Sequence, residues 1–109
     1  GGVYVALGEL DRAKDFYDQA IHVADAINYV KRQNEERASL AVAYLYAGSL
    51  AAARSTIEEA KRYEFSLNNH RVQALLGVIA LRQSDRPAAQ EAFGTAVEQA
   101  DTLLAHTAQ

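Results

Sequence analysis

The sequence predicts an all-α fold in which antiparallel helical hairpins stack as an α-solenoid of about three repeats, the first of them truncated. Three similar segments recur along the chain, and their matching alanines, Ala13, Ala53 and Ala89, lie 40 and 36 residues apart. Each segment follows a turn of small and polar residues and then combines small and bulky side chains at helical spacing. No segment shows the apolar–polar alternation that indicates a half-buried strand.

The 109 residues fit a single domain with repeats at about 1–30, 31–66 and 69–106. Apolar side chains at helical spacing predict helices near residues 1–7, 10–28, 31–47, 50–63, 70–83 and 87–105. The clearest loop is Glu64 to Asn69, where Asn68 and Asn69 can end one helix and cap the next. Residue 1 is Gly rather than Met, so we expect the chain to be cut or processed from a longer one.

Each predicted hairpin turns at a small residue, namely Gly8, Gly48 or Ser84. Glycine tolerates the left-handed backbone conformation that ends many helices. The polar residue that follows can cap the next helix, and these residues are Glu9, Ser49 and Asp85. After each turn, small residues let two helix backbones approach while a bulky residue fills the space one turn away. The small–large–small sets are Ala13/Tyr17/Ala20, Ala53/Ile57/Ala60 and Ala89/Phe93/Ala96.

This pattern resembles the tetratricopeptide repeat (TPR) family over nearly the whole chain. Leu76-Gly77 match the family's Leu-Gly pair, Tyr4 and Tyr44 match its aromatic position, and Gly8 and Gly48 match its turn. The periods of 40 and 36 exceed the family's roughly 34 residues, and its late proline is missing, so some helices are expected to be longer. Such units resemble the long-period arrays of large bacterial regulators and multidomain signalling ATPases. There the array senses or scaffolds, and another domain does the chemistry.

The resemblance implies that the first helix of each hairpin lines a concave face that binds a peptide or a helix. Carrying the family's contact positions onto this chain gives a mainly apolar set with charges at its ends: Glu35, Ala38, Val42, Leu45, Tyr46, Arg71, Ala74, Val78, Leu81 and Arg82. The Lys–Asn clamp that some members use for a carboxylate is absent, because Ala38, Val42, Ala74 and Val78 occupy those positions. An alternative is that the larger apolar residues of the set simply pack between neighbouring helices.

Composition narrows the classes of partner. The net charge is −3, with 11 basic and 14 acidic residues, and acids flank both Lys31-Arg32 and Lys61-Arg62, so we expect no nucleic-acid partner. No apolar run approaches the roughly 20 residues that span a bilayer, and no segment reads as a signal peptide, so we expect no membrane partner and a cytoplasmic location.

No residue pattern indicates an enzyme. Cysteine is absent, and the chain has no Gly-rich phosphate loop, no Gly-x-Ser-x-Gly turn and no His-Glu-x-x-His. The adjacent glutamates Glu35-Glu36 and Glu58-Glu59 point about 100° apart on a helix, so they do not face each other as an acid–base pair. We therefore expect no catalytic activity and no cofactor.

The histidines do not indicate a metal site. His22 and Asp25 share one helix face, but a metal needs three or four ligands, so a surface hydrogen bond is the simpler interpretation. His70 is expected to cap a helix or lie exposed, and His106 lies where a cation suits the helix dipole.

The predicted function is therefore a non-catalytic interaction or scaffold module for a protein or peptide, which another part of its own parent chain could also supply. The alternative is a structural or self-associating segment of a longer array in a multidomain signalling ATPase or regulator. Pairing between copies would bury Leu103 and Leu104 of the last helix, unless these leucines pack back on the preceding helix.

Overall fold

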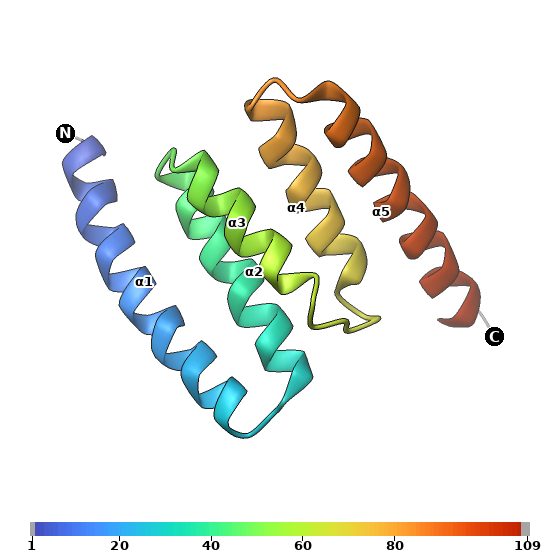
Figure 1. Cartoon of the computed structure of the whole chain (residues 1–109), viewed down its shortest axis with the longest axis horizontal. Helices are drawn as coiled ribbons and strands as arrows, with labels where there is room; N and C mark the ends of the chain where they lie inside the picture. Colours follow the sequence, from blue (N-terminus) through green and yellow to red (C-terminus); the bar gives the residue numbers. More distant parts are fainter. Residues whose placement is uncertain (1, 108–109) are drawn as a thin grey trace.

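The described residues form five α-helices and no strand (Figure 1). A computed structural model of the chain describes the backbone of residues 2–107 and the side chains of residues 8–107. The helices are α1 (Gly2–Ala26), α2 (Val30–Tyr46), α3 (Leu50–Ala60), α4 (Asn69–Arg82) and α5 (Arg86–Thr107). The all-α prediction is confirmed.

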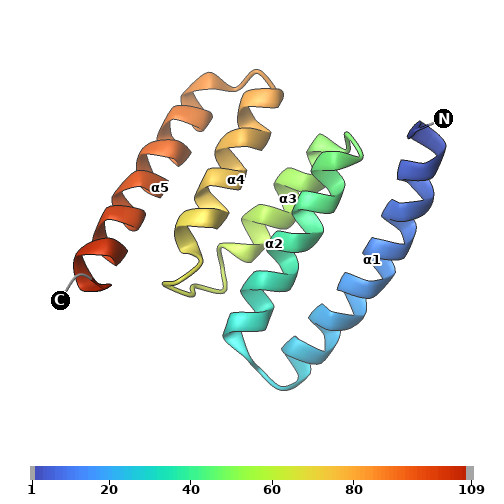
Figure 2. The same ribbon diagram turned by 180° about the vertical axis from the view of Figure 1, so that it is seen from behind.

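Consecutive helices run in opposite directions and lie against each other, from α1 at one edge to α5 at the other (Figures 1 and 2). Besides these consecutive pairs, α2 also contacts α4. The molecule measures 47 × 37 × 21 Å, and its thickness is about two helix diameters. Two hairpins, α2/α3 and α4/α5, therefore lie side by side, and α1 lies against α2 at one edge.

Three of the four connections use the same helix-ending turn. The backbone is left-handed at Asn28 (φ 54°), Gly48 (φ 79°) and Ser84 (φ 61°). The next residue's N–H then donates back to the helix, from Ser49 to the Tyr44 carbonyl at 2.9 Å and in the same pattern at the other two turns. This is the bonding of a Schellman motif, which satisfies the last free carbonyls of a helix. The turns predicted at Gly48 and Ser84 are confirmed, whereas the one at Asn28 was predicted only as a helix end.

The predicted caps are found at one of the three sites. Asp85 Oδ1 accepts a hydrogen bond from the Ala88 N–H at 3.2 Å and so caps α5. Ser49 makes no side-chain hydrogen bond at the start of α3, and Glu9 lies within α1. In the connection between α3 and α4, Asn69 Oδ1 accepts from the Phe65 N–H at 3.0 Å.

The turn predicted at Gly8 is wrong, because α1 runs through it without a break. Six residues before a turn would form too short a helix to be stable, whereas an internal glycine costs a continuous helix only about 1 kcal/mol. An added Cβ at Gly8 would meet no atom within 4 Å, so no close helix contact requires the glycine. The helices near 1–7 and 10–28 are therefore one helix. The side chain of Tyr4 lies outside the described residues.

The other helix boundaries are close to those predicted, except that α3 ends at Ala60 rather than near residue 63. The eight residues from Lys61 to Asn68 form the longest connection between helices. This connection turns away from the axis of α3, so that its Tyr63 carbonyl accepts a hydrogen bond from the Asn34 side chain of α2.

The core lies between α2, α3, α4 and α5, and the two hairpins pack it differently. Ala41 of α2 and Ile57 of α3 are both fully buried. The residues 36 positions later are Gly77 of α4 and Phe93 of α5, and a Cβ at Gly77 would lie 2.6 Å from Phe93 Cε1. The ring of Phe93 therefore occupies the space that a Cβ would fill, which explains why glycine stands there.

Candidate interaction surfaces

The face predicted to bind a partner lies on α2 and α4, which contact each other. Of its ten residues, Ala38 and Leu45 belong to the buried core, and Val78 packs against that core. The other seven are exposed or partly buried and remain accessible: Glu35, Val42, Tyr46, Arg71, Ala74, Leu81 and Arg82. Part of this set therefore serves the packing of the helices, in agreement with the alternative interpretation.

Asn34 of α2 inserts into the junction between α3 and α4. Its side chain is fully buried, and Nδ2 donates to the carbonyls of Tyr63 at 2.7 Å and Ala60 at 3.3 Å. Its Oδ1 accepts from Asn68 Nδ2 at 2.7 Å. Because α3 ends at Ala60, the Tyr63 carbonyl lies outside the helix, and the Ala60 carbonyl accepts from the Tyr63 N–H at 3.1 Å as well as from Asn34. We call Asn34, Ala60, Tyr63 and Asn68 the α3–α4 junction. It was not predicted, since its partners come together only in the folded chain.

Arg37 of α2 joins α1 to the same region. Its guanidinium donates in a two-pronged arrangement to Asp25 of α1, with Nη1–Oδ1 at 3.0 Å and Nη2–Oδ2 at 2.8 Å. It also lies 4.1 Å above the centre of the Tyr63 ring and 3.8 Å from a carboxylate oxygen of Glu59. The hydrogen bonds from Arg37 hold the pKa of the Asp25 carboxyl below its usual value. A basic residue of α2 thus bridges acidic residues of α1 and α3.

The two hairpins are connected by Arg54 of α3. Its Nη1 donates to Gln83 Oε1 at 3.0 Å and to Asp85 Oδ2 at 3.2 Å, so it holds the turn between α4 and α5. Its Nε lies 3.6 Å from Glu58. The neighbouring glutamates Glu58 and Glu59 therefore pair with different arginines and do not form a carboxylate pair.

The most apolar hollow that we find on the described surface lies beside α1, not on the predicted face. It encloses about 440 Å³ and is lined by Phe16, Ala20, Val23, Ala24 and Ile27 of α1 with Tyr29, Arg32 and Glu36 at the start of α2. We call it the α1–α2 hollow. Its large apolar side chains are exposed to solvent: Phe16 by 65%, Val23 by 58%, Ile27 by 65% and Tyr29 by 46%.

Sequence reasoning missed this hollow, although a signal for it exists. Phe16, Ala20, Val23 and Ile27 follow the i, i+4, i+7, i+11 spacing of one helix face. The face of α1 that packs on α2 contains Ala24, which is buried. Because α1 has apolar residues on two adjacent faces and contacts α2 alone among the described helices, one of these faces remains uncovered.

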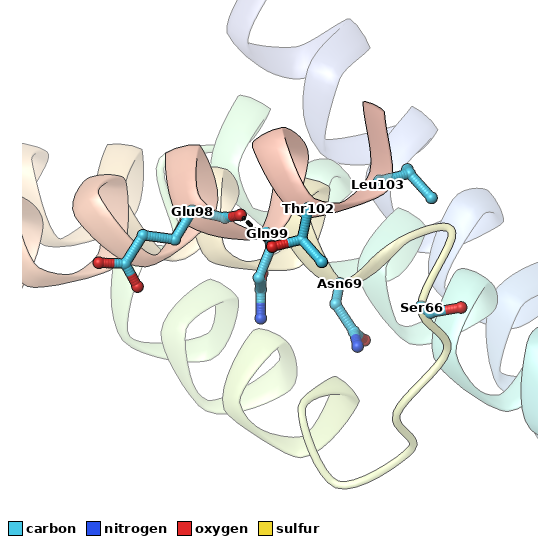
Figure 3. Close-up of a pocket in the computed structure, with 6 residues that line it drawn as sticks. All are labelled: Ser66, Asn69, Glu98, Gln99, Thr102 and Leu103. Carbon is cyan, nitrogen blue, oxygen red and sulfur yellow. Dashed lines mark hydrogen bonds between the residues drawn. The ribbon is translucent and has the colours of Figure 1, made fainter. Parts of the chain in front are cut away.

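A second hollow, of about 310 Å³, lies between the C-terminal half of α5 and the connection before α4 (Figure 3). It is lined by Ser66, Asn69, Glu98, Gln99, Thr102 and Leu103, and most of the lining surface comes from apolar atoms of these side chains. Gln99 Oε1 and His70 Nδ1 are buried and make no hydrogen bond within the described part of the chain. Leu103 is partly buried here, whereas Leu104 is 65% exposed, so the two leucines do not share one environment.

The described residues contain no group of three or more His, Asp or Glu side chains placed to hold a metal ion. Asp25, predicted to share a face with His22, is engaged by Arg37 and by Gln33 Nε2 at 3.2 Å. His106 is exposed in the last turn of α5. Across residues 2–107, none of the helices combines the length and apolar character that crossing a membrane requires.

Comparison of the chain with models of known protein families, with curated proteins and with solved structures gives no match. The resemblance to TPR proteins therefore stays a prediction from the residues. The functional proposal rests on the fold and on the surfaces described above.

Proposed function

We propose that the chain is a non-catalytic protein-interaction module, built as a TPR-like α-solenoid, that binds an α-helix of another polypeptide in the α1–α2 hollow. The observation that carries this proposal is the exposed apolar stripe of α1, where Phe16, Val23 and Ile27 each leave more than half of their surface in solvent. A contiguous exposed apolar surface of this kind, rimmed by polar residues, is typical of an interaction site.

The solenoid part of the proposal is supported by how the helices meet. Each helix lies against its neighbours in the chain, and α2 and α4, the first helices of two hairpins, also meet. The same left-handed turn closes both hairpins, at Gly48 and Ser84. In solenoids each unit contacts mainly its neighbours, and edge helices keep a face that a further helix can cover.

The shape of the hollow favours a helix over an extended peptide. From Phe16 to Ile27 the stripe extends over about 16 Å of helix, which matches three turns of a partner helix. The turn and start of α2 supply Tyr29, Arg32 and Glu36 as a second wall. Helices bind such grooves through apolar residues at i, i+3/i+4 and i+7, while no free strand edge is offered for an extended segment in the described residues.

The face on α2 and α4 remains a weaker candidate for the same function. Tyr46 and Leu81 are exposed on it, but Ala38 and Leu45 are committed to the core. This makes Leu81→Asp a useful control, because it places an aspartate on an exposed apolar residue away from the α1–α2 hollow.

The proposal is tested by capturing partners from a lysate with the native chain, a Val23→Asp/Ile27→Asp variant and the Leu81→Asp variant, after circular dichroism shows that all three are folded. The captured protein is identified, purified and titrated against the three forms. We expect the hollow variant to weaken its binding about tenfold or more and the control to leave it unchanged. Equal binding by all three forms would refute the site, and loss with Leu81→Asp alone would move it to α2 and α4.

A further inference from the structure

The apolar stripe of α1 has a spacing that matches itself when it is reversed. Phe16, Ala20, Val23 and Ile27 are separated by four, three and four residues, so the separations are the same when read from either end. Ile27 follows the last residue of α1, but its N–H still donates to the Val23 carbonyl at 3.1 Å and keeps it on the helical path. An antiparallel copy of the stripe therefore presents its side chains at the same levels.

A symmetry axis at the middle of the stripe, between Ala20 and Val23, brings two copies into register. Phe16 of one copy then lies at the level of Ile27 of the other, and Ala20 lies at the level of Val23. Two large side chains meet at each end of the contact, while an alanine faces a valine at its centre, so the helix axes can approach. The same surface serves both copies, which is the requirement of an isologous dimer.

The side of α2 that borders the hollow leaves room for such a copy. Glu36 lies about 160° around α2 from Ala38, and Ala38 is fully buried in the core that α2 shares with α3 and α4. That core therefore lies on the far side of α2, and α1 contacts α2 alone among the described helices (Figure 1). A second α1 can reach the stripe and the start of α2 without displacing a helix. Together α1, α2 and their copies would form a four-helix bundle with antiparallel neighbours.

The charges of α1 lie away from the contact. Asp18 lies about 180° around the helix from Ile27, and Asp11 lies on the same remote side. Beside the stripe, on the side away from α2 and between its first and last residues, α1 exposes Gln19 and Ala26, which carry no charge. Like charges are therefore not brought together when two stripes meet.

The charged residues of the hollow complement their own copy. Arg32 and Glu36 are its only charged lining residues, and their side chains pair at 3.1 Å, so the hollow has no net charge. They lie about one turn apart on α2, beside the middle of the stripe, because α2 runs back from the end of α1. Symmetry about that middle reverses their order, so Arg32 of one copy lies at the level of Glu36 of the other. A strongly acidic or basic helix would find no such balance.

The exposed apolar area is sufficient for a dimer of modest stability. The large apolar residues that line the hollow are exposed by 65%, 58%, 65% and 46%, namely Phe16, Val23, Ile27 and Tyr29. Together they leave on the order of 500 Å² in solvent, so two copies would bury roughly 1,000 Å², the lower end of the range for specific interfaces. We therefore expect a dissociation constant on the order of 10 μM.

On the basis of the proposed function, we infer that the helix bound in the α1–α2 hollow is α1 of a second copy of this chain. Each copy supplies the helix that fills the hollow of the other, so the pair closes as an isologous dimer. Phe16 and Ile27 meet at both ends of the contact. The affinity depends little on salt, because apolar surface supplies most of it.

The first test is sedimentation equilibrium of the full 109-residue chain, from about 1 to about 200 μM, a range that brackets the expected dissociation constant. We expect a reversible monomer–dimer equilibrium. Val23→Asp should weaken it about a hundredfold or more, because symmetry places the aspartate at two positions of one interface. The control Leu81→Asp should change it less than about twofold. Circular dichroism checks that both variants are folded.

Cross-linking tests the geometry, since the chain has no cysteine of its own. A mixture of Phe16→Cys and Ile27→Cys should form a disulfide-linked pair under oxidising conditions, and this pair keeps one native contact between Phe16 and Ile27. Phe16→Cys alone should not cross-link, because its two copies lie about 16 Å apart along the helices, whereas a disulfide spans about 7 Å between Cα atoms. Cross-linking of Phe16→Cys with itself would show a parallel pair and overturn the inferred geometry.

The outcomes separate this inference from the proposed function. If the native chain stays monomeric while binding of a captured protein still depends on Val23 and Ile27, the hollow remains a binding site and the second copy is wrong. If no captured protein depends on them either, the proposed function fails as well. A dimer that Val23→Asp leaves intact would place the pairing elsewhere. Oligomers larger than a dimer would indicate head-to-tail contacts and would also overturn the inference.

Discussion

The α3–α4 junction is covered by a helix, whereas the α1–α2 hollow is open to solvent. In the first, α2 buries Asn34 completely and satisfies it with three hydrogen bonds. In the second, Phe16 and Ile27 each leave 65% of their surface exposed. The α3–α4 junction has hydrogen-bonded polar groups at its centre, and these fix the position of α2. The α1–α2 hollow instead exposes apolar side chains to solvent. Buried polar contacts thus fix the helix arrangement in the first region, whereas in the second the apolar side chains stay in contact with solvent.

The largest expected effect is at the covered site. Asn34→Ala removes the side-chain partner of the Tyr63 carbonyl and of the Asn68 amide, leaves the Ala60 carbonyl with only the Tyr63 N–H, and removes buried volume. We expect a loss of about 3 kcal/mol in the free energy of unfolding, measured by urea denaturation followed by circular dichroism. A loss below about 1 kcal/mol would mean that water replaces these bonds at little cost, and the contrast between the two sites would disappear.

The two hairpins themselves offer the next prediction. Gly77→Ala would push its Cβ into the Phe93 ring, and we expect it to destabilise the chain by about 1.5 kcal/mol after the gain in helix propensity is included. Combined with Phe93→Ile, the same change recreates the Ala41–Ile57 pair of the first hairpin. In that background Gly77→Ala should be neutral or slightly stabilising. Additive effects in this double-mutant cycle would contradict the proposed equivalence of the hairpins.

A smaller effect with a distinct pH dependence is expected where α2 contacts α1. Asp25 is 39% exposed, and its pKa is lowered in the folded chain by hydrogen bonds from Arg37. A lowered folded-state pKa stabilises the fold above the unfolded value of about 4, and this contribution is lost as the pH falls through the folded value. Asp25→Asn should therefore cost about 1 kcal/mol at about pH 7, a figure already reduced for solvent screening. Urea denaturation should show that the difference in free energy of unfolding between Asp25→Asn and the native chain shrinks toward about pH 3. A difference that does not change with pH would exclude the Asp25–Arg37 ion pair as its source.

The smallest expected effect on stability is at the open site. Val23→Ala should change the free energy of unfolding by about 0.5 kcal/mol or less, because Val23 is 58% exposed and few neighbours lose contacts. The melting temperature measures this change. A loss comparable to that of Asn34→Ala would show that Val23 is a packing residue and that the hollow is part of the core.

The sequence was sufficient for those parts of the fold that depend on local signals. Gly48 and Ser84 end helices in the left-handed conformation, and Asp85 caps the following one, because these effects act within a few residues. Gly8 shows the limit of this reasoning, since glycine permits a turn but does not require one.

The candidate site depends on contacts between distant residues, and these were harder to predict. Ala38 and Leu45 have the helical spacing of a binding face, but their burial is set by neighbouring helices that periodicity does not locate. Conversely, the exposure of Phe16 depends on which face of α1 packs against α2. Asn34 could not be distinguished from a surface residue, because its partners from Ala60 to Asn68 lie 26 to 34 residues away.

The most direct test of the open site is an amide NMR titration of the chain with the captured and purified partner. We expect the largest chemical-shift changes to fall between Phe16 and Glu36, the stretch that contains the α1–α2 hollow, and Val23→Asp to abolish them. Changes centred instead on Tyr46, Leu81 and Arg82, or spread evenly over the helices, would contradict binding in the hollow, and the first of these outcomes would place it on the α2 and α4 face.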